Sequence, residues 1–382
     1  MANEVLKKGG EVASEVSGET RGFDFEGMRF GMKAWRASAS GAREGGSPVA
    51  PIVFVHGFAQ QASTWDDVAQ LLTDAGARCF GFELAGHGVG ACSAGDGPAE
   101  RSGFFDLLFQ ARALLAFCGT VARDAGVAPV LVGYSMGGRV ALQAACLVGA
   151  GPRDGGPKGG GKLDRTALRS SAAFAPCDRT GRLDVAGVGQ RDTATTSAGD
   201  AVRMSAAVPF SALVLESAGL GPVDDAAREA LRERNFAWAA RVRGEGVSAF
   251  MDWWAGLPLF ESQCKLANEQ RERLRAGRLA NDTESLALSF ERAGAHAMPS
   301  QGESIRALCE LAAKGIPVSY LAGELDAKYC KVASTLQSES QGAISCCVVP
   351  AAGHSIHLER PEAFGAILEE VVESCTPKPA AP

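Results

Sequence analysis

The sequence lacks an excess of positive charge. Most nucleic-acid-binding proteins have such an excess. Its 382 residues include 38 Lys and Arg against 44 Asp and Glu, for a formal net charge of −6. Because phosphate backbones are bound mainly by basic patches, this balance argues against a protein that binds nucleic acid.

Long hydrophobic runs are also missing. No apolar stretch of the chain approaches the roughly 18–20 residues that a membrane span requires. The N-terminal residues lack the apolar segment of a secretory signal. We therefore expect a protein without a membrane span that works in the cytoplasm.

Cysteines are numerous, but their spacing is not typical of disulfide frameworks or metal sites. The 11 cysteines form no Cys-x-x-Cys pair, and the one adjacent pair, Cys346-Cys347, falls in a strand-like run. A disulfide framework would have an even number of cysteines in a shorter chain, and a metal site would have clustered ligands. We interpret the cysteines as small buried residues in a reducing compartment and predict no metal site.

Most of the chain alternates short apolar runs with helical patterns. This alternation predicts parallel strands joined by right-handed helical crossovers, with helices on both faces of one sheet. A hairpin is expected at 23–36, and strands are expected at 51–55, 77–84, 130–132, 211–215, 315–323 and 344–350. Helices are expected at 62–76, 104–126, 136–149 and 359–373.

Two segments with a different composition and periodicity interrupt this alternation of strands and helices. Residues 150–208 are rich in Gly, Pro and Lys at first and then lack periodicity, which predicts a disordered, low-complexity insertion. Residues 222–300 have helical patterns only, with many arginines and tryptophans, which predicts an inserted helical cap. The remaining parts are a flexible N-terminal extension at 1–22, the core at 23–149, 209–221 and 301–376, and a tail at 377–382.

The motif Gly133-Tyr134-Ser135-Met136-Gly137 directly follows a predicted strand and directly precedes a helix. G-x-S-x-G in this context is a nucleophile elbow, a sharp turn in which small residues let neighbouring backbone approach. The helix N-terminus would place the Met136 N–H beside Ser135. A second N–H, that of Phe58, would follow the earlier strand. The pattern therefore predicts a reactive serine with an oxyanion hole.

Such a serine needs a base and an acid, in the chain order Ser…Asp…His. Asp326 and His354 both follow predicted strands, at the edge where parallel sheets place their sites. Glu324 is the alternative acid, but Asp326 lies farther past its strand and is favoured. Together with Ser135, these residues predict an α/β-hydrolase fold. The other histidines are assigned structural roles: His56, His87, His296 and His357.

Arg139 lies one helical turn after Ser135. Ester hydrolysis does not require an arginine there, whereas a guanidinium can bind a carboxylate through two parallel hydrogen bonds. The predicted cap adds further arginines, most of which are expected to be solvated: Arg228, Arg232, Arg234, Arg241, Arg243, Arg271, Arg273, Arg275 and Arg278. This concentration of positive charge indicates an anionic substrate.

From Pro51 to the C-terminal helix, a series of motifs resembles the 2-succinyl-6-hydroxy-2,4-cyclohexadiene-1-carboxylate synthase (MenH) family. The Gly-Gly-Arg after the serine, the Leu-Val-Leu-Glu-Ser-Ala-Gly run and the Trp…Leu-Pro-Leu-Phe element are the most specific. The matching segments are Phe54–Phe58 with Trp65, Leu84–Gly88, Val132–Ala141, Leu213–Gly219, Phe250–Trp254 with Leu257–Phe260, Tyr320–Asp326 and Ala352–His357.

The resemblance implies a lyase that eliminates pyruvate from a small tricarboxylate and requires no cofactor or metal. Ser135 would be the base, activated by His354 and oriented by Asp326, and the Phe58 and Met136 N–H groups would stabilise the developing oxyanion. The implied substrate contacts are Tyr134, Arg139, Trp254, Arg278 and either Arg228 or Arg232. The insertion at 150–208 departs from the family pattern.

Two other functions stay open at this point. The same triad could hydrolyse esters, thioesters or lactones if Ser135 attacked carbon instead of a proton. A third possibility is a non-catalytic member of the fold that binds a ligand or partner, which the intact triad disfavours. Release of pyruvate from the tricarboxylate that the resemblance implies, 2-succinyl-5-enolpyruvyl-6-hydroxy-3-cyclohexene-1-carboxylate, would distinguish the lyase from the other two functions.

Overall fold

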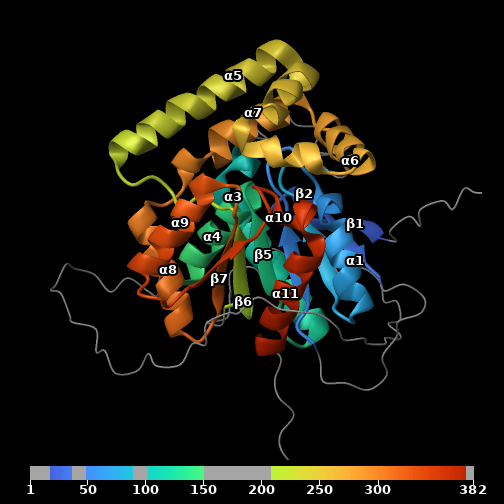
Figure 1. Cartoon of the computed structure of the whole chain (residues 1–382), viewed down its shortest axis with the longest axis vertical. Coiled ribbons are helices and arrows are strands. Elements are labelled where there is room, and N and C mark those ends of the chain that lie inside the picture. Colours follow the sequence, from blue (N-terminus) through green and yellow to red (C-terminus); the bar gives the residue numbers. More distant parts are fainter. Residues whose placement is uncertain (1–17, 37–48, 89–101, 150–207, 376–382) are drawn as a thin grey trace, which may run out of the picture.

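The computed structural model describes residues 18–36, 49–88, 102–149 and 208–375 (Figure 1). The expectations for the start of the N-terminal extension, for the insertion up to residue 207 and for the tail lie outside these residues. The strands are β1 (Gly18–Phe25), β2 (Met28–Trp35), β3 (Ile52–Val55), β4 (Cys79–Phe82), β5 (Val130–Tyr134), β6 (Ala212–Glu216), β7 (Val318–Gly323) and β8 (Ser345–Val349).

The helices predicted at 62–76, 104–126, 136–149 and 359–373 are present to within a few residues, whereas the core helices at 301–313, 327–339 and 356–359 were not predicted. The core helices are η1 (Ala62–Trp65), α1 (Asp66–Asp74), η2 (Ser102–Phe105), α3 (Leu107–Ala125), α4 (Met136–Gly149), α8 (Gln301–Ala313), α9 (Ala327–Glu339), α10 (Ile356–Glu359) and α11 (Pro361–Cys375). Among the described helices, none is both long and apolar enough to cross a membrane.

The eight strands form one sheet in the order β1-β2-β4-β3-β5-β6-β7-β8. β3 to β8 pair in parallel, while β2 pairs antiparallel with β4 and with β1. The mostly parallel sheet confirms the predicted fold class. It follows from the short apolar runs, because strands covered on both faces by helices need apolar residues throughout.

The edge hairpin is longer than the sequence pattern indicated. β1 begins at Gly18, inside the segment predicted to be a flexible extension, where it pairs with Trp35 of β2. Residues 18–22 contain no large apolar side chain, so hydrophobic periodicity could not identify them as a strand. The backbone ladder continues there, and the Glu19 carboxylate accepts from Arg21 and Arg36 at 2.8 and 2.7 Å.

Alternate residues of β3 enter two separate hydrophobic layers. Val53 and Val55 belong to the layer built with α3, α4 and α8, whereas Ile52 and Phe54 belong to the layer built with α1 and α11. This alternation follows from the two-residue period of a strand. The helices therefore cover both faces of the sheet, as Figure 1 shows.

A helical cap lies over the edge at which the parallel strands end (Figure 1). Its elements are α5 (Asp225–Ala255, interrupted by a kink at Gly246), η3 (Pro258–Lys265), α6 (Asn268–Leu279), α7 (Thr283–Ala293) and η4 (Ala295–Ala297). An aromatic cluster of Phe250, Trp254 and Phe290 holds the cap together, and Phe58 from the core packs against it. The cap therefore contacts the loop that was predicted to supply an oxyanion-hole N–H.

Candidate active site

Ser135 stands at the turn between β5 and α4 with a φ of 49°. This left-handed conformation is unfavourable for a residue with a side chain, and such strain is commonly retained at functional sites. The surrounding glycines permit the turn. A Cβ atom on Gly137 would lie 2.3 Å from the Val55 carbonyl oxygen, and one on Gly133 would lie 2.8 Å from the Gly137 oxygen.

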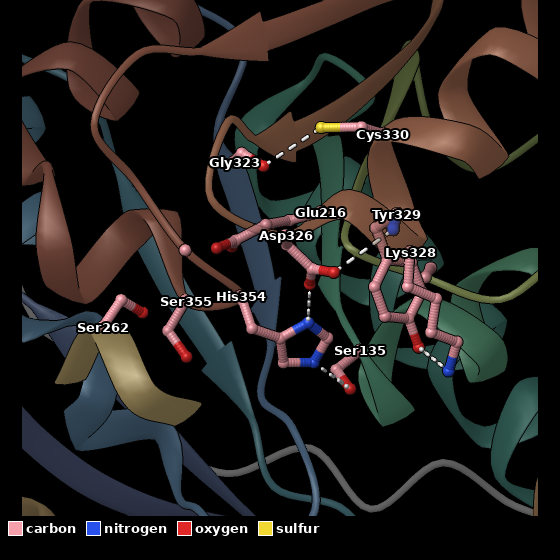
Figure 2. Close-up of polar contacts among 12 residues, drawn as sticks. Ser135, Glu216, Ser262, Gly323, Asp326, Lys328, Tyr329, Cys330, His354 and Ser355 are labelled. Atoms are coloured by element: carbon pink, nitrogen blue, oxygen red, sulfur yellow. Dashed lines mark hydrogen bonds and ion pairs between the residues drawn. The ribbon is translucent and has the colours of Figure 1, made fainter. Parts of the chain in front are cut away.

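The structure brings the three predicted triad residues together (Figure 2). The Nδ1 of His354 donates to Oδ2 of Asp326 at 2.8 Å, and its Nε2 lies 3.2 Å from the Ser135 Oγ. His354 and Asp326 are buried, whereas Ser135 is partly exposed. Because Asp326 binds Nδ1, it leaves Nε2 free to accept the serine proton.

Asp326 also caps the N-terminus of α9. Its Oδ1 accepts the backbone N–H of Tyr329 at 3.2 Å, so both carboxylate oxygens have partners. The alternative acid, Glu324, is exposed and accepts the Ala351 N–H at 2.9 Å. The geometry therefore places Asp326, and not Glu324, beside the imidazole.

Glu359 supports the loop that carries His354. Its carboxylate accepts the N–H groups of Gly353 at 2.7 Å and Ser355 at 3.3 Å, one on each side of the histidine. It also accepts the hydroxyl of Ser262 in the cap at 3.0 Å. This residue has no motif of its own, so the sequence reasoning did not find it.

The two predicted oxyanion-hole residues flank the serine from different segments. Met136 is the first residue of α4 and is buried, and Phe58 is partly buried in the loop after β3. Within the described residues, neither backbone N–H has a hydrogen-bond acceptor. They are therefore free to donate to an oxygen that gains charge during a reaction.

A hydrogen-bonded chain runs from the elbow into the cap. The Tyr134 hydroxyl lies 2.7 Å from Ser355 Oγ, which accepts from the Gln263 side chain at 2.9 Å. The other end of the Gln263 amide accepts from Arg278 at 3.0 Å. Tyr134, predicted as a substrate contact, is thus buried, and burial raises the pKa of its phenol well above the ordinary value. Gln263 and Ser355 were not identified from the sequence.

Arg278 is buried without a carboxylate partner among the described residues. Its exposed fraction is 6%, its Nε has no hydrogen-bond partner, and its guanidinium lies 5.4 Å from the centre of the Phe260 ring. Burial lowers the pKa of this guanidinium. A hollow of about 620 Å³ in the cap is lined by Arg278, Gln263 and Phe260, among others, but by no triad residue. Arg278 therefore borders both this hollow and the chain that reaches Ser355.

Arg139, which is partly buried, also lacks a carboxylate partner among the described residues. Its Nε donates to the Ala293 carbonyl oxygen at 3.3 Å, and among the described residues no carboxylate forms an ion pair with it. Burial, and to a smaller extent the charge of Arg234, lower the pKa of Arg139 to about 10. The side chain is therefore still charged at neutral pH, and an incoming anion would relieve its lack of a partner.

The first cap helix places three more arginines in this neighbourhood. Arg228 donates to the carbonyl oxygens of His296 and Met298 at 2.6 and 2.7 Å, while the exposed Arg232 pairs with Glu229. Arg234 lies close enough to Arg139 to affect its pKa. The sequence predicted no specific role for Arg234, because its charge and its position in the sequence do not distinguish it from the other arginines of the cap.

Trp254, the predicted cap tryptophan, is buried among aromatic rings. Its ring centre lies 5.1 Å from that of Phe58 and 5.7 Å from that of Phe260, which in turn lies 5.7 Å from the His354 ring. Trp254 therefore connects the cap core to the wall of the site.

The histidines outside the triad all have structural partners. His56 accepts the Leu84 N–H at 3.0 Å, and His87 lies 2.9 Å from the Ala85 carbonyl oxygen. His357 forms a buried pair with Glu216 at 2.9 Å, and His296 contacts the Asn235 amide at 2.9 Å. Groups of three or more His, Cys, Asp or Glu suited to a metal ion are absent from the described residues.

The sequence matches the alpha/beta hydrolase family over residues 52–367. A Citrobacter koseri 2-succinyl-6-hydroxy-2,4-cyclohexadiene-1-carboxylate synthase is 29% identical over 319 residues, 83% of this chain and 92% of that protein. A Bacillus subtilis protein, whose name gives the same activity as a provisional assignment, is 34% identical over 166 residues. That match covers 43% of this chain and 57% of the Bacillus protein.

Solved structures share the fold over most of their length. MenH from S. aureus superposes with a TM-score of 0.61 at 21% identity, covering 90% of this chain and 98% of that one. A thermophilic esterase from Thermogutta terrifontis has a TM-score of 0.58 at 18% identity, covering 94% of this chain and 100% of the other. At these identities the two structures establish the architecture alone.

Proposed function

The chain belongs to the alpha/beta hydrolase family, and we propose that it uses the serine site of that family for an elimination. The reaction is that named for the Citrobacter koseri relative, a synthase of 2-succinyl-6-hydroxy-2,4-cyclohexadiene-1-carboxylate. The substrate is 2-succinyl-5-enolpyruvyl-6-hydroxy-3-cyclohexene-1-carboxylate, and the second product is pyruvate.

The observation that carries this proposal is a pair of arginines, the partly buried Arg139 and the buried Arg278. Neither meets a carboxylate among the described residues, and one lies on the elbow helix while the other lies in the cap. A buried charge without a partner is costly unless a ligand supplies one. The proposed substrate has three carboxylates, whereas a simple neutral ester has none, so the site suits the tricarboxylate better.

The reaction begins with removal of a ring proton. The hydrogen on C2 is acidic because it lies next to the succinyl ketone. Ser135 Oγ accepts this proton while passing its own to His354, whose positive charge Asp326 stabilises. The ketone oxygen gains charge, and the N–H groups of Phe58 and Met136 are available to donate to it.

The electron pair then moves around the ring. The C2–H pair forms the C2–C3 double bond, the C3–C4 double bond shifts to C4–C5, and the C5–O bond to the enolpyruvyl group breaks. The leaving oxygen takes the pair and a proton, and the enol tautomerises to pyruvate. The ring retains two double bonds, which is the cyclohexadiene of the product name.

We place this reaction in the cytoplasm. All nine cysteines within the described residues are free thiols, as expected in a reducing compartment. The function does not involve a nucleic acid, in keeping with the net charge of −6.

The test is a direct assay of the purified full-length protein. Pyruvate release from the enolpyruvyl substrate is followed by coupling to lactate dehydrogenase, with the spontaneous rate subtracted. Ser135→Ala and His354→Ala are expected to lower kcat by at least about a thousandfold, in line with the loss of other serine triads. A wild-type protein that hydrolyses p-nitrophenyl acetate well but releases no pyruvate above the spontaneous rate would refute the proposal.

A further inference from the structure

Tyr329 lies beside the triad but was not identified from the sequence. It is the third residue of α9, and its backbone N–H donates to the Oδ1 of Asp326 at 3.2 Å. Its ring lies 4.9 Å from the His354 ring at an interplanar angle of 41°. The backbone and ring of Tyr329 therefore pack against the triad, and neither contact involves its hydroxyl group.

The hydroxyl group lies at the far end of this ring, and Figure 2 shows it joined to the Lys328 amine. Lys328 donates to this hydroxyl at 3.4 Å, so the phenol oxygen serves as an acceptor. Within the described residues, the phenol proton has no acceptor, although Tyr329 is only 6% exposed. An unused donor on a residue that is so little exposed is therefore available to an acceptor on a ligand.

The neighbouring charges identify the kind of acceptor. Tyr329 lies close enough to Arg139 and Arg234 to act on the pKa of both guanidinium groups. Lys328, which donates to the phenol oxygen, adds a third cation near this hydroxyl. A ligand group that these cations and the phenol proton would both attract is an anion, and a carboxylate matches this donor set.

We propose that Tyr329 is a specificity-determining residue that donates its phenolic proton to the substrate carboxylate bound by Arg139. Lys328 keeps the phenol oriented by occupying a lone pair of its oxygen. This inference deepens the proposed function and rests on the assignment of Arg139 as a carboxylate ligand. It adds a neutral donor to the arginine that binds this carboxylate through its charge.

The decisive variant is Tyr329→Phe, which keeps the ring against His354 and the N–H bond to Asp326. We expect KM for the enolpyruvyl substrate to rise about tenfold, the value of one hydrogen bond to a charged group, with kcat within about twofold. A role limited to positioning Asp326 and His354 would lower kcat and leave KM unchanged. That result, or an unchanged KM, would overturn the proposal.

Tyr320→Phe is the matched control. Tyr320 is also buried, but its hydroxyl donates to the Ala218 carbonyl oxygen at 2.7 Å and has no role in the site. Its removal is expected to lower the melting temperature while leaving KM unchanged. A rise of KM in Tyr320→Phe equal to that in Tyr329→Phe would count against the proposal, because loss of any buried hydroxyl would then have the same effect.

Calorimetric binding separates this inference from the proposed reaction. The probes are pyruvate and 2-succinylbenzoate, a stable aromatic diacid with the ring and succinyl carboxylates of the product. Tyr329→Phe should weaken one of them about tenfold, and that probe identifies the carboxylate concerned. If the wild-type protein binds these anions but releases no pyruvate from the substrate, only the proposed reaction fails. Equal binding by wild type and Tyr329→Phe, or no binding by either, would overturn the inference.

Discussion

At the scale of single residues, the arginines fall into two groups: those that form an ion pair with a carboxylate and those that do not. Arg243, on the surface of the cap, is bound by Glu284 and by Glu291, and these carboxylates raise its pKa. Arg139 and Arg278 form hydrogen bonds only to a carbonyl oxygen and to an amide oxygen, respectively, among the described residues, and burial lowers the pKa of both. A ligand anion can therefore stabilise Arg139 and Arg278, whereas the charge of Arg243 is already neutralised by Glu284 and Glu291.

Removal of Arg139 should impair use of the tricarboxylate. Arg139→Ala leaves the carboxylate without its bidentate partner, and kcat/KM for pyruvate release is expected to fall about a hundredfold, because buried hydrogen bonds to charged groups are among the strongest. Arg139→Lys should recover part of the loss, since it restores charge but not the planar fork. Arg243→Ala is the control, and equal losses in both variants would contradict the assignment.

The pKa of Arg139 also predicts a dependence on pH. Its guanidinium is positively charged below a pKa of about 10 and neutral above it. KM for the anionic substrate should therefore be constant between pH 7 and 9 and rise as the pH passes through about 10. KM is to be measured up to pH 10.5, with the fold monitored by circular dichroism. A folded wild-type protein with constant KM throughout this range would be inconsistent with the prediction.

At the scale of elements, the strand–turn–helix unit of β5 and α4 requires glycine where α4 crosses β3. A Cβ on Gly137 would lie 2.3 and 2.5 Å from the carbonyl oxygens of Val55 and His56. These atoms belong to the end of a buried central strand, which cannot move aside without disturbing its neighbours.

Gly137→Ala is therefore expected to destabilise the protein as a whole. We predict a fall in melting temperature of about 5 °C or more, measured by differential scanning fluorimetry. Gly219→Ala is the matched control, because a Cβ at Gly219 would meet nothing within 4 Å. A Gly137→Ala protein as stable as the control would show that the elbow is less tightly packed than the structure indicates.

His87, in the loop after β4, should make the fold sensitive to acid. Burial, above all, lowers its pKa from 6.5 to about 3. Between these values the unfolded state binds a proton and the folded state does not. The free energy of unfolding should therefore fall with decreasing pH, by up to about 1.4 kcal/mol per unit.

The test of this prediction is urea unfolding at pH 7 and 4.5, for wild type and His87→Gln. The variant has no imidazole to protonate, so its stability should depend less steeply on pH in this range. Equal slopes in the two proteins would assign the acid sensitivity to other groups.

At the scale of the whole molecule, the described residues on either side of the predicted insertion lie far from Ser135. α4 runs from Met136 to Gly149, and 14 residues of helix span about 21 Å. The chain then re-enters the sheet at the start of β6, whereas the site lies at the ends of the strands. Both attachment points are thus at the edge of the sheet opposite the triad.

Deletion of residues 152–206 should accordingly preserve activity. Loop length contributes little to the free energy of folding, about 0.6 kcal/mol for each doubling. We expect kcat/KM for pyruvate release to stay within about threefold of the wild-type value. A deletion variant with a wild-type circular dichroism spectrum but no activity would assign the segment a role in the reaction.

The sequence by itself determined the sheet and the reactive serine. Strands 130–132 and 211–215, the elbow at Ser135 and the order Ser…Asp…His are local patterns, read from the spacing of neighbouring residues. The start of β1 was missed, since Gly18–Gly22 pairs through its backbone and has no apolar pattern, and the helices α8 and α9 were not predicted. Local patterns sufficed because strand and helix periods are set by the chain itself.

Only the tertiary structure decided the distances and partners of the side chains around the serine. His354 reaches Ser135 across 219 positions of sequence, and Gln263 reaches Ser355 across 92. The lack of a carboxylate beside Arg139 and the unused proton of Tyr329 likewise depend on segments that are distant in the chain. Burial and hydrogen-bond partners are properties of the packed molecule, because the segments that pack against a charge or hydroxyl group determine its environment.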